Sequence, residues 1–407
     1  MQEQRATRSG VGRTTGRRRF LTGVTAAGVL ALAGCVGGDD DDDVGDDGAN
    51  DGNGGTTDST DDAPATVAEA EPLGEPVDGT AVSWDDLGDL EGELNIYSGR
   101  TRDQIDPVFA ALEEEYTELT INRDYDSNDA QVNQLIEEGA ATPADLMYSQ
   151  DPGALGELEC NGLVQELPAD VVDAVQESWR DPDGYWTGVT GRVRSIQYNS
   201  DRWDGDADDF PTDILEFATD ERFQGIISTR PNSGTFRGFI QAMVERKGEE
   251  TTREWVRQMV DDQDAQLFSG GSDQAAAVNQ GGDDDPIVGL GNSYYAARIL
   301  NEDPDAPIRV TFTENDAGCL FSIAGVGVTN DPDDPALVAE LIRHLLAAEG
   351  QEFMMDANGE YPVVEGVDYV GSLPDLEDIN PPTFNLSEFD MELQSAQQLL
   401  NEEEMTV

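Results

Sequence analysis

Strand-like and helix-like segments alternate along the chain from about Leu90, and this order constrains the fold more than any other feature. Short apolar segments typical of strands occupy residues 94–97, 119–121 and 144–148. Apolar residues at helical spacing separate them, first at Ile105, Val108, Phe109 and Leu112, then at Val132, Leu135 and Ile136. This β-α-β-α-β order predicts a parallel sheet with helices on its faces, where ligands bind beyond the carboxyl ends of the strands.

The same alternation resumes after Gly188 and continues toward the C-terminus. It includes two amphipathic helices, around residues 236–244 and 337–345. The chain after position 90 has roughly 315 residues, which is more than one hydrophobic core usually serves. We therefore expect an α/β fold with two lobes.

The N-terminus has the pattern of an export signal. Arginines at 17–19 precede an apolar run at 24–33, which is too short to span roughly 30 Å of hydrocarbon. The order Arg-Arg-x-Phe-Leu resembles a twin-arginine signal, and Leu-Ala-Gly-Cys, ending at Cys35, resembles a lipoprotein cleavage box. We expect residues 1–35 to be such a signal and Cys35 to be lipidated, at the cell surface on the outer face of the cytoplasmic membrane. An ordinary signal peptide with a chance arginine cluster is the alternative.

An acidic segment follows, because residues 37–62 consist almost entirely of Asp and Gly with Asn, Ser and Thr. Such a composition cannot bury enough apolar surface to offset its chain entropy, and its like charges repel. We expect residues 36–90 to be a disordered tether that holds the folded part, residues 91–407, away from the membrane. A calcium-binding tract is the alternative, although the regular Gly-x-Asp repeat of such tracts is missing from this segment.

The chain carries 86 acidic and 23 basic residues, a net charge of −63, and its one lysine is Lys247. This composition resembles that of extreme halophiles, whose acidic surfaces stay hydrated in concentrated salt. It argues against nucleic acid and anionic lipid as partners, because both require a basic face. A lipid anchor is therefore the expected attachment to the membrane.

Few residues suit redox or zinc chemistry. Besides Cys35 the chain has Cys160 and Cys319, expected as buried free thiols, with a disulfide as the alternative in an oxidising compartment. His344 is the one histidine, and we expect it to flank an apolar helical stripe. A His-rich zinc site is therefore excluded, and a Ser-His-Asp triad would depend on His344 alone. Asn385 begins a glycosylation sequence that is compatible with every class of function.

Six short motifs occur in order along the folded part. They lie at residues 97–100 (Tyr-Ser-Gly-Arg), 144–149 (Ala-Asp-Leu-Met-Tyr-Ser), 186–199 (Trp-Thr-Gly-Val-Thr-Gly-Arg-Val-Arg, then Tyr-Asn), 231–236 (Pro-Asn-Ser-Gly-Thr-Phe), 292–295 (Asn-Ser-Tyr-Tyr) and 360–362 (Glu-Tyr-Pro). Together they resemble the ferric-iron-binding solute-binding proteins of ABC importers.

This resemblance implies a two-lobed periplasmic-binding-protein-like fold of type II, with a cleft between the lobes. Two hinge-crossing strands are expected near residues 188–199 and 319–329. The implied division puts lobe 1 at about 91–190 plus 325–375 and lobe 2 at about 195–318 plus 376–407.

Tyr294 and Tyr295 match the iron-binding tyrosine pair of the family. Ferric iron is a hard cation that prefers anionic oxygen, and it can deprotonate a phenol whose free pKa is ~10. Neighbours on a strand point to opposite faces, so convergence of both side chains predicts an irregular loop, for which Gly289 and Gly291 supply conformational freedom. Packing of the two aromatic rings is the alternative.

Other positions of the ligand shell depart from the family. Thr101 stands where many members have a histidine, and Gln150 stands where they have a glutamate, with Asp151 next to it. A hydroxyl and an amide are poor ferric ligands, so this lobe contributes either the Asp151 carboxylate, beside Gln150, or no ligand. Tyr198 or Tyr148 could complete the set, although core packing is the favoured role for both. These departures leave open an organic or phosphorylated anion as the cargo.

Family members bind a carbonate or phosphate beside the iron, and residues suited to such an anion are present. An amphipathic helix, whose free N–H groups and dipole attract anions, begins at Ser233, Gly234 and Thr235. A plain N-cap is the alternative for this helix start. Asn292 matches a further anion contact, whereas Gly271 replaces another family asparagine. Arg192 is the expected counter-charge, because arginine binds oxyanions bidentately, with a structural salt bridge as the alternative.

The resemblance thus implies the solute-binding component of an ABC importer, a lipoprotein of haloarchaeal type that catalyses no reaction. It would bind ferric iron with carbonate or phosphate as a synergistic anion, close its lobes around them, and deliver them as a monomer to a permease and its ATPase. One alternative keeps the fold with a small organic or phosphorylated anion as cargo. The other is a secreted enzyme with a carboxylate pair, for which no acid–base pair is recognisable.

Overall fold

The computed structural model describes residues 66–77, 79, 81–382 and 393–407. The predicted signal, the lipidation site Cys35 and the glycosylation sequence at Asn385 lie outside the described residues. The α-helices are α1 (Arg102–Glu115), α2 (Asn128–Glu138), α3 (Pro152–Cys160), α4 (Ala169–Asp173), α5 (Gly234–Lys247), α6 (Glu249–Asp261), α7 (Gly271–Gln280), α8 (Ser293–Glu302), α9 (Pro335–Leu346), α10 (Ala348–Asn358), α11 (Leu376–Ile379) and α12 (Leu393–Glu402). The β-strands are β1 (Gly92–Ser98), β2 (Leu119–Tyr125), β3 (Leu146–Ser149), β4 (Val164–Gln165), β5 (Trp186–Asn199), β6 (Ile227–Thr229), β7 (Gln266–Leu267), β8 (Val288–Asn292), β9 (Ile308–Thr311), β10 (Phe321–Thr329) and β11 (Tyr361–Pro362).

The strands follow one another across the molecule in the order β2-β1-β3-β10-β5-β8-β6-β7. β1 pairs in parallel with β2 and β3, which confirms the parallel sheet predicted from the first alternation. β6 likewise pairs in parallel with β7 and β8. β5 is antiparallel to its neighbours, pairing with β10 through residues 186–193 and with β8 through residues 194–198.

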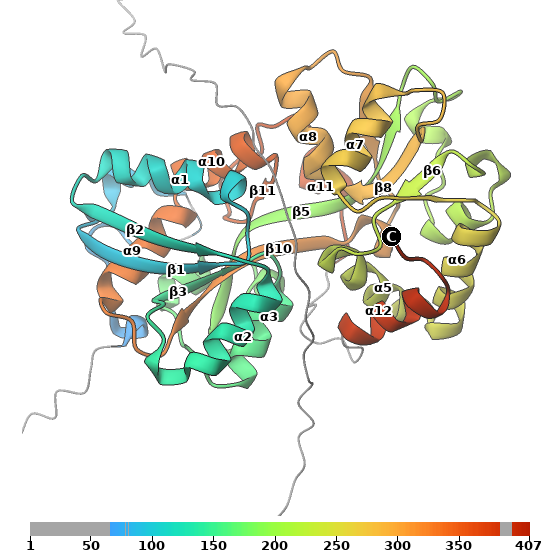
Figure 1. Cartoon of the computed structure of the whole chain (residues 1–407). Helices are drawn as coiled ribbons and strands as arrows, with labels where there is room; N and C mark the ends of the chain where they lie inside the picture. The colour runs from blue at the N-terminus through green and yellow to red at the C-terminus, as the bar shows by residue number, and fades with distance from the viewer. Residues whose placement is uncertain (1–65, 78, 80, 383–392) are drawn as a thin grey trace, which may run out of the picture. The chain divides into compact units, whose positions relative to one another are not determined.

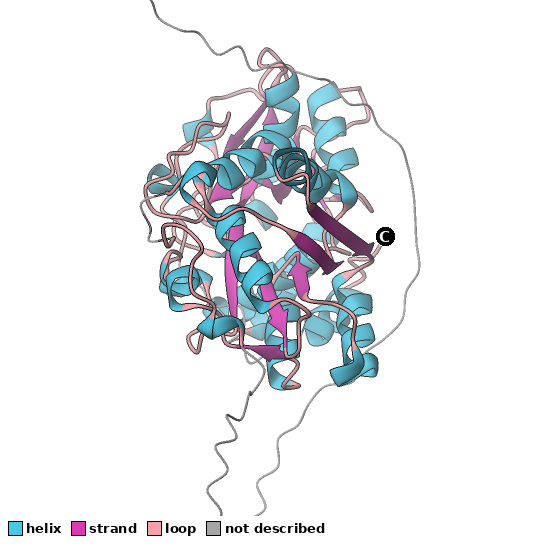
Figure 2. Ribbon diagram, turned by 90° about the vertical axis from the view of Figure 1, so that its left-hand side faces the viewer, coloured by secondary structure: helices cyan, strands magenta, loops and turns pink. Residues whose placement is uncertain are grey.

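Two large hydrophobic cores lie on either side of β5 and β10. The first contains apolar residues of β1, β2, β3, α1, α3 and α9, and the second contains those of β8, α5, α6 and α12. Figure 1 shows β5 and β10 running between these two groups of helices, and Figure 2 shows helices surrounding the strands. The two-lobed α/β fold is therefore confirmed, and β5 and β10 are the strands that cross between the lobes.

The prediction of a tether as far as residue 90 is wrong for its last part, because the described residues from 66 onward pack against the first core. Val67 is fully buried, and its N–H donates to Gln165 Oε1 at 2.9 Å. Trp84 Nε1 donates to the carbonyl oxygen of His344 in α9 at 2.8 Å. Apolar side chains placed within an otherwise acidic segment thus attach it to lobe 1.

Three smaller expectations need correction. Cys160 and Cys319 are both free, but Cys160 is exposed at the end of α3 and only Cys319 is buried. His344 is fully buried rather than at a flank, and its Nε2 lies 2.9 Å from the Tyr116 hydroxyl. Residues 376–379 pack against the first core rather than belonging to lobe 2.

Within the ranges that the structure describes, no helix is both long and apolar enough to cross a membrane.

Candidate functional site

A cavity of about 60 Å³ lies where α3, β5, β10 and α5 come together. Five of the residues predicted from the sequence line it, together with Arg194, Ser322 and Gln241: they are Asp151, Arg192, Gly234, Thr235 and Asn292. Asp151 comes from lobe 1, Arg192 from the crossing strand β5, and the other three from lobe 2. The structure therefore brings a lobe 1 carboxylate, a hinge arginine and the predicted anion contacts to one site.

The pairing of β5 explains why its arginines reach the cavity. Arg192 lies opposite Ser322 of β10, and Arg194 lies opposite Asn292 of β8. Residues two apart on a strand share a face, and so do directly opposed residues on antiparallel strands. All four side chains therefore lie on the face that α5 covers, and all four line the cavity.

α5 begins at the cavity as predicted. Ser233 is its N-cap and accepts a hydrogen bond from the Phe236 N–H at 3.1 Å. The helix leaves the preceding N–H groups free for a ligand, which is a recurrent way of binding anions. The Thr235 hydroxyl accepts a hydrogen bond from Asn292 Nδ2 at 3.0 Å, so the α5 start is fixed to the end of β8.

Tyr294 and Tyr295 lie on the first turn of α8, not on the irregular loop expected from the sequence. Successive residues of a helix project about 100° apart, which is close enough for two large rings to meet. The ring centroids of Tyr294 and Tyr295 lie 4.1 Å apart. Gly289 and Gly291 belong to the regular strand β8, so their conformational freedom plays no part in this convergence.

Gly271 leaves the space that the ring of Tyr295 occupies. A Cβ atom at position 271 would lie 2.2 Å from Tyr295 Cε2, so any side chain there would displace the ring. The Tyr295 hydroxyl also accepts a hydrogen bond from Arg230 Nη1 at 3.3 Å. The glycine at position 271 thus makes room for one of the two tyrosines.

Tyr294 is almost fully buried and lies among cationic side chains. Burial, reinforced by Tyr295, raises the pKa of Tyr294 well above its usual value, whereas Arg192 and Arg298 lower it. The guanidinium carbon of Arg298 lies 5.2 Å from the Tyr294 ring centroid. Ionisation of Tyr294 is therefore favoured only by added positive charge, which a metal cation would supply if one were bound.

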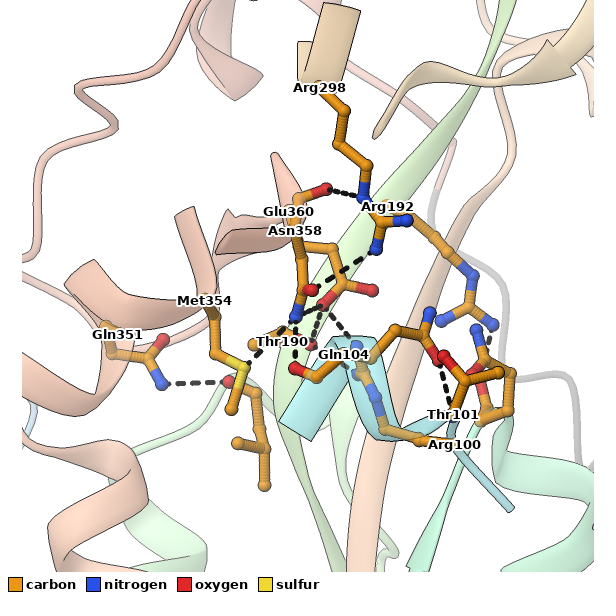
Figure 3. A network of polar contacts seen from close by, with 12 residues as sticks. Arg100, Thr101, Gln104, Thr190, Arg192, Arg298, Gln351, Met354, Asn358 and Glu360 are labelled. Carbon is orange, nitrogen blue, oxygen red and sulfur yellow. Dashed lines mark hydrogen bonds and ion pairs between the residues drawn. The ribbon is translucent and has the colours of Figure 1, made fainter. Parts of the chain in front are cut away.

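A buried polar network joins the tyrosine helix to lobe 1 (Figure 3). Glu360 Oε2 accepts hydrogen bonds from Arg100 Nη2 at 2.7 Å and from the Thr190 hydroxyl at 3.0 Å. Asn358 Nδ2 donates to the same oxygen at 3.3 Å, and Arg298 Nη2 donates to Asn358 Oδ1 at 3.2 Å. Glu360 and Arg100 belong to two of the six sequence motifs, and their role is to hold lobe 1 against β5 and α8.

Arg192 has spare hydrogen-bonding capacity. It is 1 % exposed, and its Nη2 donates to the backbone carbonyl of Gln150, while its Nε and Nη1 have no partner among the described residues. Burial lowers the pKa of Arg192, against the opposing effect of Glu360. No ion pair ties Arg192 to a carboxylate within the described ranges, so the structural salt bridge considered for it is absent there. Arginine donors left open in a cavity suit an oxyanion.

Asp151, the predicted lobe 1 ligand, and Thr101, which stands where many family members are expected to have a histidine, both lie at helix starts. Asp151 is the N-cap of α3, with Oδ1 accepting from the Ala154 N–H at 3.2 Å and Oδ2 accepting from Asn128 Nδ2 at 2.6 Å. Thr101 directly precedes α1 and is exposed. Asp151 is therefore the member of this group that faces the cavity with a charged oxygen.

The two further tyrosines are separated from each other. Tyr198 lies four residues beyond Arg194 on β5 and packs in the second core. Its ring centroid lies 5.0 Å from that of Phe210. Tyr198, Tyr294 and Tyr295 are all absent from the cavity lining, but Tyr294 lies near enough to Arg192 to be affected by its charge, whereas the charges that act on Tyr198 are those of Arg309 and Asp206. Tyr148 is fully buried in the first core, and its ring centroid lies 5.3 Å from the Arg100 guanidinium carbon. Its hydroxyl group has no hydrogen-bond partner among the described residues.

Among the described residues, no group of three His, Cys, Asp or Glu side chains could hold a metal ion. The chemistry of the site is therefore that of phenols, one carboxylate and guanidinium groups. Phenolate oxygens suit a hard trivalent cation, and guanidinium groups suit an oxyanion bound beside it. Arg194 was missed by the sequence reasoning, although its spacing of two from Arg192 on a crossing strand is a usable signal.

Comparison with known proteins places these observations in a family. A family model for bacterial extracellular solute-binding proteins matches residues 141–385. Iron uptake protein A1 of Synechocystis sp. is 27% identical over 319 residues, which cover 76% of this chain and 86% of that protein. The Fe(3+)-binding periplasmic protein of Serratia marcescens is 27% identical over 251 residues, covering 61% of this chain and 73% of that protein.

Among solved structures, iron-bound HitA from Pseudomonas aeruginosa superimposes with a TM-score of 0.68. Its sequence identity is 23%, and the match covers 77% of this chain and 98% of that one. The family model describes solute-binding proteins, and the Serratia marcescens relative is named as an Fe(3+)-binding protein, in agreement with the expectation that the chain catalyses no reaction. Because the family model spans more than half of the chain, this protein belongs to the family of bacterial extracellular solute-binding proteins.

Proposed function

We propose that this protein is the solute-binding component of an ABC importer and that its cargo is ferric iron bound with a synergistic oxyanion. The observation that carries the proposal is the convergence of Tyr294 and Tyr295 beside the open donors of Arg192. The names of the relatives from Synechocystis sp. and Serratia marcescens support iron as the cargo.

The charges explain why an anion accompanies the metal. Ferric iron bound by two phenolates keeps one positive charge and several open coordination positions. Carbonate or phosphate fills such positions, while Arg192, the start of α5 (Ser233 to Thr235) and Asn292 hold its outer oxygens. Asp151, with Gln150 beside it, is the candidate ligand from lobe 1.

Transport follows from the arrangement of the lobes. β5 and β10 are the connections about which the lobes close, and closure buries the ligand between Asp151 and Gly234. A Cβ atom at Gly234 would lie only 3.6 Å from Asp151 Oδ2, so the two lobes already approach closely there. The closed surface is the one that the permease, which works with an ATPase, recognises. We further propose twin-arginine-type export, lipidation at Cys35 and a monomeric state.

The test removes only the phenolic oxygens. The protein in molar salt with ferric iron and bicarbonate should develop a visible phenolate-to-iron absorption band. The Tyr294→Phe/Tyr295→Phe double variant keeps both rings in place and should lose this band together with the bound iron. Tyr198→Phe is the matched control and should keep both, because Tyr198 lies in the second core.

Retention of the band and of the iron content by the double variant would overturn the tyrosine assignment. If the unaltered protein binds no ferric iron but binds a small organic or phosphorylated anion in the same buffer, the alternative cargo replaces iron.

A further inference from the structure

The helix that carries the tyrosine pair is held by lobe 1 as well as by lobe 2. α8 follows directly from β8, whose residues 288 and 290 lie in the second core. Ala297, three residues after Tyr294, belongs instead to the first core, and its backbone carbonyl accepts a hydrogen bond from the Ser372 hydroxyl at 3.4 Å. α8 therefore lies between the lobes, and contacts on its lobe 1 side can fix where the tyrosines lie.

Gly359 brings the backbone of lobe 1 directly against α8. It is buried, it ends α10, and its φ of 68° lies in the left-handed region that favours glycine. A Cβ atom there would lie 2.5 Å from the Ala297 Cβ atom and 3.3 Å from the Tyr294 carbonyl oxygen. The first of these distances is too short for two carbon atoms that are not bonded. The absence of a side chain thus allows the turn of residues 358–360 to lie this close to the helix.

Polar contacts of Asn358 hold α8 in one orientation against this turn (Figure 3). Arg298 Nε donates to the Asn358 carbonyl oxygen at 3.3 Å, and Arg298 Nη2 donates to Asn358 Oδ1 at 3.2 Å. Asn358 is itself tied to lobe 1, because its Nδ2 donates to the Gln104 carbonyl oxygen at 2.9 Å. These bonds resist rotation of α8 about its own axis, while Gly359 sets the distance of α8 from lobe 1.

The orientation of α8 matters for a metal ligand because a tyrosine side chain is long. Its hydroxyl oxygen lies far from the helix axis, so a small rotation of the helix moves that oxygen by a larger amount. Metal–ligand distances tolerate errors of only about 0.2 Å, and groups that do not touch the metal usually orient those that do. The contact with lobe 1 lies at Tyr294 itself, because Tyr294 contributes the carbonyl oxygen beside Gly359.

We propose that the turn of residues 358–360 positions the tyrosine pair for the metal, and that Gly359 is the positioning residue on which this placement depends. This inference rests on the proposed function, because iron binding by Tyr294 and Tyr295 is what the turn serves. Gly359 lies outside the cavity lining and acts through α8.

The experiment crowds this contact and then relieves it. Gly359→Ala should weaken ferric iron binding by about ten- to a hundredfold, measured by competition with a chelator in molar salt with bicarbonate, and should shift the phenolate-to-iron absorption band. Ala297→Gly removes the Cβ atom that the new methyl group meets. The Gly359→Ala/Ala297→Gly double variant should therefore recover most of the affinity and return the band toward its position in the parent protein.

Thermal unfolding separates positioning from general destabilisation. Alanine at a left-handed φ and glycine inside a helix both lower stability, so the double variant should still unfold at a lower temperature than the parent protein. A merely structural role of Gly359 would make iron affinity follow the unfolding temperature. Gly162→Ala is the matched control, because Gly162 has a φ of 64° and nothing lies within 4 Å of a Cβ atom there. It should lower the unfolding temperature and leave iron affinity unchanged.

A second variant tests the same contact from the helix side. Ala297→Val enlarges the side chain that faces Gly359 and needs no left-handed residue, so it should also weaken iron binding. It provides the test if Gly359→Ala does not fold. Circular dichroism verifies that each variant is folded.

The outcomes separate this inference from the proposed function. Unchanged iron affinity and an unshifted band in folded Gly359→Ala and Ala297→Val would overturn the positioning role. A double variant that binds iron no better than Gly359→Ala would also overturn it, since the loss would then come from strain within the turn. Absence of iron binding by the parent protein would instead overturn the proposed function, and this inference with it.

Discussion

Glu360 carries a buried charge that contributes to the packing beside the site. It is fully buried, and its partner Arg100 is fully buried as well. Burial raises the pKa of the Glu360 carboxyl, but Arg100 and Arg192 outweigh this effect and hold that pKa below its usual range. A carboxyl with a depressed pKa stabilises the fold above its usual pKa, and the contribution is lost as the pH falls through the folded value.

Glu360→Gln should therefore lower the free energy of unfolding at neutral pH by about 3–5 kcal/mol, because Arg100 is left buried without its counter-charge. The parent protein should also lose stability on acidification below the ordinary glutamate pKa of about 4.3, and the variant should lose less. Urea unfolding at constant molar salt, at pH 7 and pH 4, measures both effects.

Glu249→Gln is the matched control for this change, because Glu249 pairs with Arg253 at the surface. Exposed ion pairs contribute little, so its unfolding curve should stay close to that of the parent. A Glu360→Gln protein as stable as the control at pH 7 would show that the buried pair is dispensable.

Three helices begin around the candidate site, and their starts form its walls. α3 begins after Asp151, α5 after Ser233 and α8 after Asn292. The N-terminus of a helix carries unpaired N–H groups and the positive end of the dipole, so three of them at one cleft favour bound negative charge. The N-termini of α3, α5 and α8 thus add to the attraction that the Arg192 guanidinium group exerts on a bound anion.

Asp151 has two roles in this arrangement, which two substitutions separate. Asparagine caps helices as well as aspartate does, so Asp151→Asn should keep the unfolding temperature while lowering iron affinity through loss of the carboxylate. Asp151→Ala should lower iron affinity equally and in addition cost about 1 kcal/mol of stability. Thermal unfolding and chelator competition give the two quantities. Full iron affinity in Asp151→Asn would exclude Asp151 as a ligand.

The whole molecule has to tolerate a net charge of −63. At low ionic strength such charges repel over distances comparable with the protein, whereas the Debye length shrinks to about 3 Å at 1 M salt. The ion pairs of the described residues are few relative to this charge, and the fully buried pair of Arg100 and Glu360 is not screened in the same way.

Stability should accordingly rise with salt. We expect the unfolding temperature, followed by circular dichroism across a chloride series, to fall steadily from molar salt to about 0.1 M as screening is lost. Sodium and potassium chloride should behave alike if screening alone is responsible. An unchanged unfolding temperature at about 0.1 M would show that the acidic surface does not require concentrated salt.

Much of this protein could be predicted from the amino-acid sequence. Alternating apolar segments predict the parallel strands β1, β2 and β3, because apolar periodicity reports which faces must be buried. The N-cap pattern at Ser233 predicts the start of α5, because capping is a local interaction. Six short motifs were enough to suggest a ferric-iron-binding solute-binding protein, and the family model shows the broader family of bacterial extracellular solute-binding proteins.

The remainder was decided by tertiary structure, because it depends on contacts between residues far apart in the chain. Gly271 faces the ring of Tyr295, which occupies the space that a side chain at position 271 would take. Arg194 is a cavity residue only because β5 pairs with β8 and α5 covers their shared face. The segment before residue 90 looks like the end of an acidic tether, yet apolar residues of its described part, such as Val67, Val77 and Leu87, pack in the core of lobe 1. Local pattern thus determined the elements and the type of fold, while packing between distant segments decided which residues share the site.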